Sequence, residues 1–445
     1  MVEWMATAKN IAAVCAIVFA GTVVGKGMDR SEFHIGCFSF NEPAQTPKHI
    51  AEARACGMDY VGGGIDARNR IAMEAFSENG LAASCIFLPR ICGPHPARGT
   101  EALRRKLPKD RLENNLNAFN AKFRHPSIAM MNICDEPPVQ SMAFLGDMVR
   151  LVDKCCPGVL AYVNLYPNYA RVAENGTDVT KSQLGCANYR DYIDEYCRQV
   201  PTHYIAYDHY PIMATAEATR ACSARWYGNL KVVADACRAT GRDLWVGPQV
   251  NSRRKAPPIT ENHLRYQAFS AMAFGAVNLT WACWTLGWWD NNLMETNGTL
   301  TCQYPKLKKV NFEVRRIAPA YMKMRNVATH FVGFKGEANA LSKYGIVPVE
   351  RLDVPGFDGI AATDGSSLVV GEMVSRVHDG SAKAVFIYAA NDCADEKRAE
   401  HVVEFSAHGQ VSVLGPDEGL RIAGCGQGRC RLTLSDNSCA LVWQD

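Results

Sequence analysis

The order of apolar and polar positions divides the chain into two regions. From residue 33 to about residue 285, short apolar runs alternate with segments whose apolar residues recur at helical spacing. Eight runs are predicted to be strands: 33–40, 58–65, 81–89, 128–137, 160–167, 203–211, 243–251 and 276–285. Eight strands alternating with helices are what a (β/α)8 barrel requires. We therefore predict an α/β fold, with a TIM barrel over residues 28–328 that is closed by a helix after the last strand. A doubly wound open sheet is the alternative, but no glycine-rich phosphate-binding turn follows the first strand.

From about residue 331 the pattern changes to short alternating strands separated by Gly, Asp and Asn turns. This pattern predicts an antiparallel β-sandwich domain over residues 329–445. The region has few aromatic residues and no evident cluster of polar ones. We interpret it as an accessory domain.

The amino-terminal segment contains one long apolar run, residues 11–24, preceded by Lys9. These 14 residues are fewer than the roughly 20 that a membrane-spanning helix needs. A positive residue, a short apolar run and small residues around 20–22 are typical of a secretory signal. We predict a signal peptide over residues 1–27 and a secreted or periplasmic protein; an uncleaved membrane anchor is the alternative.

Charge and cysteine content narrow the possible partners. Lys and Arg number 48 against 45 Asp and Glu, so the net charge of +3 does not indicate a nucleic-acid partner. The 18 cysteines show no spacing typical of zinc ligands, and we expect neither a metal nor another cofactor. Cysteines within predicted strands, such as Cys37, Cys85, Cys134 and Cys283, are expected to be buried as small apolar residues. Cys425 and Cys430 flank a glycine-rich turn and would form a local disulfide in a secreted protein.

The carboxyl ends of the predicted strands carry polar and aromatic side chains. In barrel enzymes these ends meet at one mouth, where the catalytic groups lie. The candidates are Asn41 after the first strand, Asp135 and Glu136 at the fourth, Asp208 and Tyr210 at the sixth, Gln249 at the seventh, and Trp284, Trp289 and Asp290 after the eighth. Acids, amides and aromatic rings together are suited to sugar hydroxyls and sugar rings, so the expected partner is a glycan.

Strand periodicity sharpens this set. Alternation places Asp208 and Tyr210 on one face of their strand and His209 on the other, and it turns Trp281 toward the helices. A regular pleat would also send Asp135 and Glu136 in opposite directions. Both reach the mouth only if the strand ends there, which the following two prolines indicate. Simpler interpretations are that the Asp-Glu-Pro segment is a turn, that Asp208 caps a helix and that the tryptophans belong to the core.

The Asp135-Glu136 pair at the end of the fourth strand resembles that of retaining barrel glycoside hydrolases. The resemblance, which covers residues 30–328, is to chitobiase-like β-hexosaminidases and to the bacterial β-N-acetylgalactosaminidases of glycoside hydrolase family 123. Ordinary double-displacement barrel glycosidases instead have Asn-Glu-Pro on the fourth strand and a nucleophilic Glu on the seventh. Here Asp135 replaces the Asn, and Gln249 stands where that Glu is expected.

The resemblance implies substrate-assisted catalysis, in which the sugar's own 2-acetamido oxygen attacks the anomeric carbon. By resemblance, Asp135 orients the acetamido N–H and Glu136 is the general acid/base. Tyr210 would donate to the acetamido carbonyl, and Trp284 would pack the methyl group. The remaining candidates, which are Asn41, Asp208, Gln249, Trp289 and Asp290, would bind hydroxyls and the sugar ring.

The resemblance favours an exo-acting enzyme that removes β-linked N-acetylhexosamine, with N-acetylgalactosamine preferred only by resemblance. Two alternatives stay open. One is a β-galactosidase-like barrel enzyme that uses Glu136 with another carboxylate such as Asp208. The other is a catalytically inactive carbohydrate-binding protein, since the missing seventh-strand Glu is also what an inactive glycosidase would show.

Overall fold

The computed structural model describes most of the chain after the predicted signal peptide. The described residues are 28–86, 109–173, 182–285, 287–377, 382–391, 393, 398–407, 409–417, 419–422 and 428–444. The predicted signal peptide, residues 1–27, lies outside them, and so does Cys425, the proposed partner of Cys430. Cys430 itself is disulfide-bonded.

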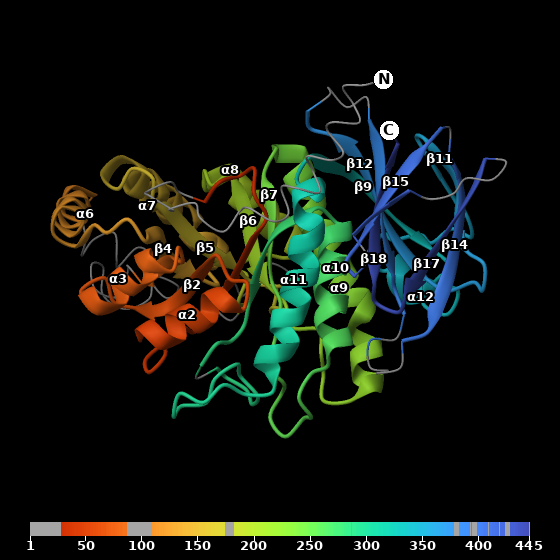
Figure 1. Cartoon of the computed structure of the whole chain (residues 1–445). Helices are drawn as coiled ribbons and strands as arrows, with labels where there is room; N and C mark the ends of the chain where they lie inside the picture. Colours follow the sequence, from red (N-terminus) through yellow and green to blue (C-terminus); the bar gives the residue numbers. More distant parts are fainter. Residues whose placement is uncertain are drawn as a thin grey trace, which may run out of the picture.

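Eight parallel strands form a closed barrel in sequence order, which confirms the predicted fold (Figure 1). They are β1 (His34–Cys37), β2 (Tyr60–Ile65), β3 (Ala82–Ile86), β4 (Ile128–Asp135), β5 (Leu160–Leu165), β6 (Tyr204–Asp208), β7 (Asp243–Gly247) and β8 (Ala276–Trp281). The helices around them are α2 (Pro47–Ala55), α3 (Arg70–Glu78), α6 (Lys109–Phe123), α7 (Met142–Cys155), α8 (Tyr189–Gln199), α9 (Ala216–Thr240), α10 (Glu261–Ala273) and α11 (Gln303–Tyr321), with a short 3-10 turn η1 (Val139–Ser141) before α7.

Aromatic and polar side chains fill the inside of the barrel. Tyr204 stacks on Trp245 with ring centroids 4.3 Å apart, and Tyr162 stacks on both rings. The hydroxyl of Tyr60 on β2 donates to Asn278 on β8 at 2.8 Å, linking the two strands on either side of β1. The interior is therefore a packed core, and the space available to a ligand lies above it at the mouth.

The outward faces of the strands contact the helices, as the alternation predicts. His209 packs edge-on against Trp226 of α9, and its Nδ1 lies 2.9 Å from Oδ1 of Asn229. The indole N–H of Trp281 donates to Asn311 of α11 at 3.0 Å. Asp208, on the other face of β6, is thereby turned toward the barrel axis.

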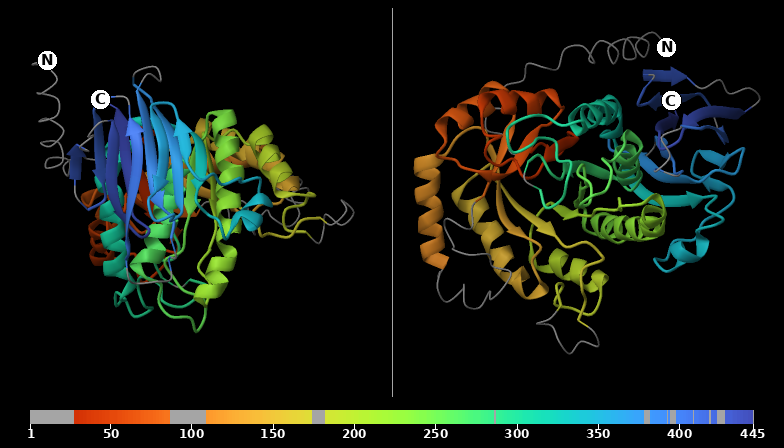
Figure 2. Two further views of the ribbon diagram at one scale, coloured as in Figure 1. Left: turned by 90° about the vertical axis from the view of Figure 1, so that its right-hand side faces the viewer. Right: turned by 90° about the horizontal axis from the view of Figure 1, so that it is seen from below.

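The carboxyl-terminal domain consists of two antiparallel sheets, which confirms the predicted β-sandwich (Figure 2). One sheet has the order β16-β15-β18-β13-β12-β9 and the other β10-β11-β14-β17. The strands are β9 (Met324–Val332), β10 (Leu352–Val354), β11 (Phe357–Ala362), β12 (Leu368–Ser375), β13 (Lys383–Ala389), β14 (Glu400–Ala407), β15 (Val411–Gly415), β16 (Gly419–Ile422), β17 (Arg429–Ser435) and β18 (Cys439–Gln444), and the helix α12 (Ala338–Ser342) follows β9. Because β9 starts at Met324, this domain's first strand spans the predicted boundary at residues 328–329.

The sandwich packs against the side of the barrel formed by α9 and α10. Tyr227 of α9 contacts Phe331 of β9 edge-on at 5.2 Å. Gly371 of β12 lies so close to α10 that a Cβ there would be 2.4 Å from the carbonyl oxygen of Ala273. Any larger residue at this position would force the two domains apart.

Buried cysteines behave as the sequence predicts. Cys37, Cys85, Cys134 and Cys283 are all buried. Within the described part of the chain, no helix combines the length and the apolar character that crossing a membrane requires. In the same part, no group of three His, Cys, Asp or Glu side chains is arranged to hold a metal ion.

Candidate active site

The end of β4 brings two consecutive acids to the mouth of the barrel. Asp135 is the last residue of the strand and is exposed. Glu136 has a φ of 49°, which is the left-handed conformation, and its backbone N–H donates to the carbonyl of Asn164 at 2.8 Å. This turn ends the pleat, so the two side chains are no longer required to point to opposite faces.

Asn164, on β5, connects two carboxyl groups of the neighbouring strands. Its side-chain nitrogen donates to Asp135 at 3.0 Å and to Asp208 at 2.7 Å. The amide is buried, so its position is fixed by the strand and by these two bonds. No residue of β5 is among the predicted site residues, because a single Asn inside an apolar strand does not stand out in the sequence.

Asp208 forms the floor of the site. Its side chain is buried, and it forms hydrogen bonds with Asn164 and with the hydroxyl of Tyr210. Burial and the nearby charge of Asp135 raise the pKa of Asp208, against the opposing effect of these hydrogen bonds. The charge of Asp135 thus favours the protonated form of Asp208.

Glu136 holds a proton at neutral pH. Burial, followed by the charges of Asp208 and Asp135, raises its pKa to about 8. A carboxyl group with a pKa in this range can donate a proton to a leaving oxygen at neutral pH. The same shift indicates that Glu136 lies close to both other acids.

Aromatic rings form the wall beside Asp208. The Tyr210 ring lies 5.3 Å from that of Trp289 and 5.5 Å from that of Trp288, measured between centroids. Trp288 is 45% exposed, so its ring is available to a ligand. The guanidinium of Arg253 lies 4.6 Å from the ring centroid of Trp289.

Two tyrosines after β5 also belong to this region and were missed in the sequence. Tyr169 contacts His209 edge-on at 5.0 Å, and its ring is 42% exposed. Burial of its hydroxyl and the charges of Asp208 and Glu136 raise its pKa. The pKa of Tyr166 is raised by burial and by the charge of Glu136. Alternation continued from β5 places Asn164 and Tyr166 on one face, a signal that could have found Tyr166, whereas Tyr169 lies in the following loop and is not reached by it.

Gln249 and Trp284 are buried, and their described contacts are with groups other than the three acids. The side chain of Gln249 is fully buried; it accepts from the backbone N–H of Ile212 and donates to the carbonyl of Asn251. Trp284 is also fully buried and packs against Phe40, with centroids 5.2 Å apart. Both residues lie beyond the ends of their strands, β7 at Gly247 and β8 at Trp281, so strand parity does not fix where they point.

Asp290 and Asn41 are engaged in loop structure. One carboxylate oxygen of Asp290 accepts from the backbone N–H of Lys255 at 2.9 Å. The side-chain oxygen of Asn41 accepts from the backbone N–H of Gly64 at 2.7 Å, which ties the loop after β1 to the end of β2. The structure thus brings together Asp135, Glu136, Asp208, Tyr210 and Trp289 from the predicted set.

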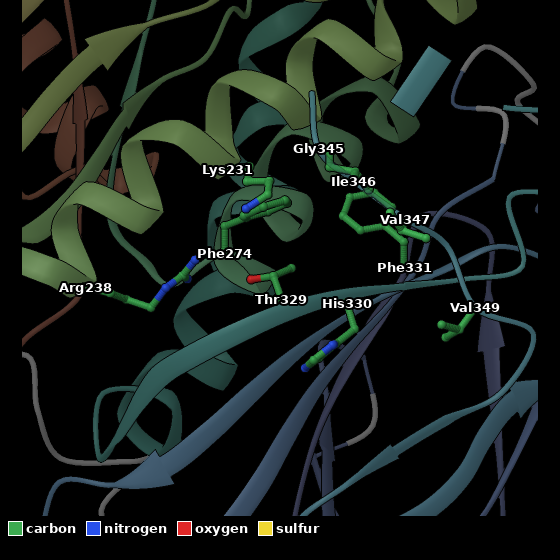
Figure 3. A pocket seen from close by; sticks show the side chains of 10 residues that line it. All are labelled: Lys231, Arg238, Phe274, Thr329, His330, Phe331, Gly345, Ile346, Val347 and Val349. Carbon is green, nitrogen blue, oxygen red and sulfur yellow. The ribbon is translucent and has the colours of Figure 1, made fainter. Parts of the chain in front are cut away.

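A separate cavity of about 230 Å³ lies where the two domains meet, between α9, β9 and residues 345–349 (Figure 3). Apolar side chains such as Phe274 and Ile346 line it together with Lys231, Arg238 and His330. The three basic groups already have acidic partners, Asp235 for the first two and Glu372 for His330. This cavity is distinct from the barrel mouth, and none of its lining residues belongs to the carboxyl cluster.

The sequence matches no protein-family model and no curated protein. The fold is similar to that of a solved protein described as a glycoside hydrolase, with a TM-score of 0.51 and 8% identity over 94% of this chain and 96% of that one. A catalytic mutant of a GH42 β-galactosidase from G. stearothermophilus gives a TM-score of 0.51 and 8% identity over 94% of this chain and 100% of that one. The β-galactosidase of the psychrophilic Marinomonas ef1 has a TM-score of 0.47 and 9% identity; 65% of this chain is covered, and the chain spans 62% of that protein. At these identities the likeness is one of fold, a (β/α)8 barrel followed by a β-rich domain, and the chemistry has to be argued from the site itself.

Proposed function

We propose that this chain is a barrel glycoside hydrolase acting on β-glycosides, and that it removes terminal β-linked N-acetylhexosamine by substrate-assisted catalysis. The observation that carries the proposal is the position of Asp135 and Glu136. They are consecutive acids at the end of β4, one exposed in the mouth and the other holding a proton. The likeness in fold to solved glycoside hydrolases is consistent with this activity.

The end of β7 supports a mechanism without an enzyme nucleophile. A retaining glycosidase ordinarily needs a second carboxylate on the opposite side of the scissile bond from the acid. Gln249, which follows β7, cannot attack as a carboxylate, and both ends of its amide are bound to backbone groups. The 2-acetamido oxygen of the substrate would supply the missing nucleophile and form an oxazoline.

Each acid then has its own task. Glu136 gives its proton to the leaving oxygen, and in the second step it takes a proton from the water that opens the oxazoline. Asp135 accepts a hydrogen bond from the acetamido N–H and balances the positive charge that develops on the ring. Asn164 holds Asp135 in place for this contact.

Tyr210 has to release its present partner to act on the substrate. Its hydroxyl is hydrogen-bonded to Asp208. When Asp208 holds a proton, as its raised pKa favours, the carboxyl group can donate to the phenolic oxygen instead. The Tyr210 proton is then free to bond the acetamido carbonyl.

A β-galactosidase-like mechanism is the second candidate, and the position of Asp208 favours it. After burial, the charge of Asp208 is the largest influence on the pKa of Glu136, so these two acids are neighbours. Asp208 would then be the nucleophile. Its burial and its two hydrogen bonds make it a poorer nucleophile than an exposed carboxylate, which is why we place this candidate second.

A panel of chromogenic aryl β-glycosides, with and without the 2-acetamido group, separates the two candidates. We expect hydrolysis of aryl 2-acetamido-2-deoxy-β-hexosides, with the galacto isomer preferred by resemblance to family 123, and inhibition by a thiazoline analogue of the oxazoline. Asp135→Asn and Glu136→Gln should each lower kcat at least about 100-fold. Equal cleavage of plain β-galactosides, with no effect of the thiazoline, would establish the second candidate instead.

A further inference from the structure

Arg253 carries a positive charge at the mouth that no acid among the described residues neutralises. Its guanidinium lies on the face of Trp289, 4.6 Å from the ring centroid. The Nε–H of this guanidinium is buried and has no hydrogen-bond partner. Among the described residues, no acidic side chain lies within ion-pair distance of Arg253. Buried donors are normally satisfied, so this one indicates that a partner is missing.

The loop that carries Arg253 is held firmly in place. Ser252 and Asp290 exchange backbone hydrogen bonds of 2.9 and 3.0 Å, and the Asp290 carboxylate accepts from the Lys255 backbone. The side chain of Asn291 donates to the Ser252 hydroxyl at 2.7 Å. The Asp290 carboxylate is thus bonded to a backbone N–H of this loop, and no ion pair joins it to Arg253 in the described structure.

The same guanidinium is close to the proposed catalytic groups. Trp289, on which it stacks, lies 5.3 Å from the Tyr210 ring, and Tyr210 is bonded to Asp208. The phenol of Tyr169 experiences the charges of Asp208, Glu136 and Arg253 together. Arg253 therefore stands at the edge of the carboxyl cluster.

We infer that Arg253 and Trp289 form a subsite for an anionic group, a carboxylate or a sulfate ester, on the sugar next to the one that is cleaved. A guanidinium stacked on an indole keeps its in-plane N–H groups free, and these match the geometry of both groups. The exposed ring of Trp288 beside it provides a face for the sugar that carries the charge. The inference rests on the proposed function and names the class of its substrate as acidic glycans.

Electrostatics explains why such a subsite needs a dedicated cation. Asp135 carries a negative charge at the mouth, and Asp208 adds a second one when it is ionised, so an acidic sugar placed there without compensation would be repelled. The guanidinium of Arg253 at the rim would offset this repulsion for an anionic group next to it. It would also select for acidic over neutral glycans of the same length.

Binding to a non-hydrolysing form tests this inference independently of turnover. In the Glu136→Gln background, calorimetry would compare three oligosaccharides that share a terminal β-linked 2-acetamido sugar: one followed by a neutral sugar, one by a uronic acid and one by a sulfated sugar. We expect at least one acidic ligand to bind about tenfold more tightly than the neutral one. If only the uronic acid ligand or only the sulfated ligand binds more tightly than the neutral one, that result identifies the anionic group that the subsite recognises. Equal binding of all three overturns the inference.

Variants of two neighbouring arginines provide the matched comparison. Adding Arg253→Gln should remove the preference for the acidic ligand, and Arg253→Lys should retain part of it because the charge remains. Arg254→Gln, in the same loop but with an exposed side chain, should keep the full preference. If Arg253→Gln keeps it as well, Arg253 does not bind the anion. A failure of the proposed function itself would instead appear as no hydrolysis of aryl 2-acetamido glycosides by the wild-type protein.

Discussion

Asp135 and Asp208 accept hydrogen bonds from one and the same nitrogen, the side-chain amide of Asn164. This arrangement follows from the sheet order, because β5 lies between β4 and β6 and the register pairs Asn164 directly with Asp135. The exposed acid that we assign to the substrate and the buried acid beneath it are therefore mechanically and electrostatically linked. A change in the protonation of one is felt by the other.

The first prediction concerns this link. Asn164→Ala removes the donor that holds Asp135, so the carboxylate can turn away from the acetamido group. We expect kcat to fall about 10- to 100-fold with a smaller change in KM, because a misplaced catalytic group costs rate more than binding. Steady-state kinetics with an aryl 2-acetamido glycoside would measure this.

A helix-cap variant controls for a general loss of stability. Asn188 is exposed and caps α8 by accepting from the backbone N–H of Asp191, and none of its described hydrogen bonds reaches the three acids. Asn188→Ala should cost about 1 kcal/mol of stability and leave kcat within twofold. If both Asn variants lose activity in proportion to their thermal stability, the proposed role of Asn164 is wrong.

The second prediction is a pH profile. Glu136 must be protonated to act as an acid, and its pKa is raised to about 8, so kcat/KM should fall as the pH rises through about 8. Asp208→Asn removes a neighbouring negative charge and thereby lowers the pKa of Glu136. The alkaline limb of the profile should move to lower pH. An unchanged limb, or a move to higher pH, would show that another group controls it.

The strands of the barrel were predictable because each is a short apolar run bounded by polar residues and followed by a helical segment. The alternation of side chains also predicted correctly the face of the strand toward which Asp208 and Trp281 point, since both lie within regular strands. The alternation of side chains along a strand no longer predicts the orientation of Gln249 and Trp284, because both lie after the ends of their strands. Their positions depend on hydrogen bonds and packing between segments distant in the sequence, which no local pattern contains.

The linked acids show a similar limit. Asp135 and Glu136 were visible as a motif, but their coupling to Asp208 passes through Asn164, an ordinary polar residue in an apolar strand. Arg253 was also inconspicuous, because a basic residue in a loop usually faces solvent. Its lack of an acidic partner among the described residues becomes evident only when the surrounding charges are placed in space.

The third prediction concerns His401 in the sandwich domain. Its Nδ1 lies 2.7 Å from Asp364 and its Nε2 lies 2.7 Å from Asp436. Burial lowers the pKa of His401, but the hydrogen bonds to these two carboxylates outweigh it and raise the pKa overall. A raised folded-state pKa means that this stabilisation is present below the unfolded value of about 6.5 and is lost as the pH rises through the folded value.

The test compares thermal unfolding at pH 5.5 and at pH 9. His401→Gln should destabilise the protein by about 1.5–3 kcal/mol at pH 5.5 and by clearly less at pH 9. His330→Gln, which removes a single contact of 3.2 Å to Glu372 on a neighbouring strand, serves as the matched histidine variant and should cost less at pH 5.5. An equal loss of stability in His401→Gln at both pH values would show that the charge of His401 between Asp364 and Asp436 does not stabilise the domain.

The fourth prediction concerns the ion pair behind the barrel that joins α10 to α11. Arg265 and Glu313 are almost fully buried and form two parallel hydrogen bonds of 2.6 and 2.8 Å. Glu313→Gln leaves the buried guanidinium with its bonds to Asn262 and to the partly exposed Glu261 but without its buried counter-charge, so we expect a loss of about 3–5 kcal/mol in unfolding free energy. Lys309→Gln breaks an exposed pair with the same Glu261 and should cost no more than about 1 kcal/mol.

A double replacement separates the cost of an unpaired charge from the worth of the pair itself. Taking two charges out of water costs several kcal/mol each, and the bidentate contact repays this only in part. Arg265→Met combined with Glu313→Leu removes both charges and fills the same space with apolar groups. The double variant should therefore be more stable than Glu313→Gln alone in urea denaturation. If it is less stable, the pair contributes net stability, and its role would extend beyond fixing how α10 and α11 pack.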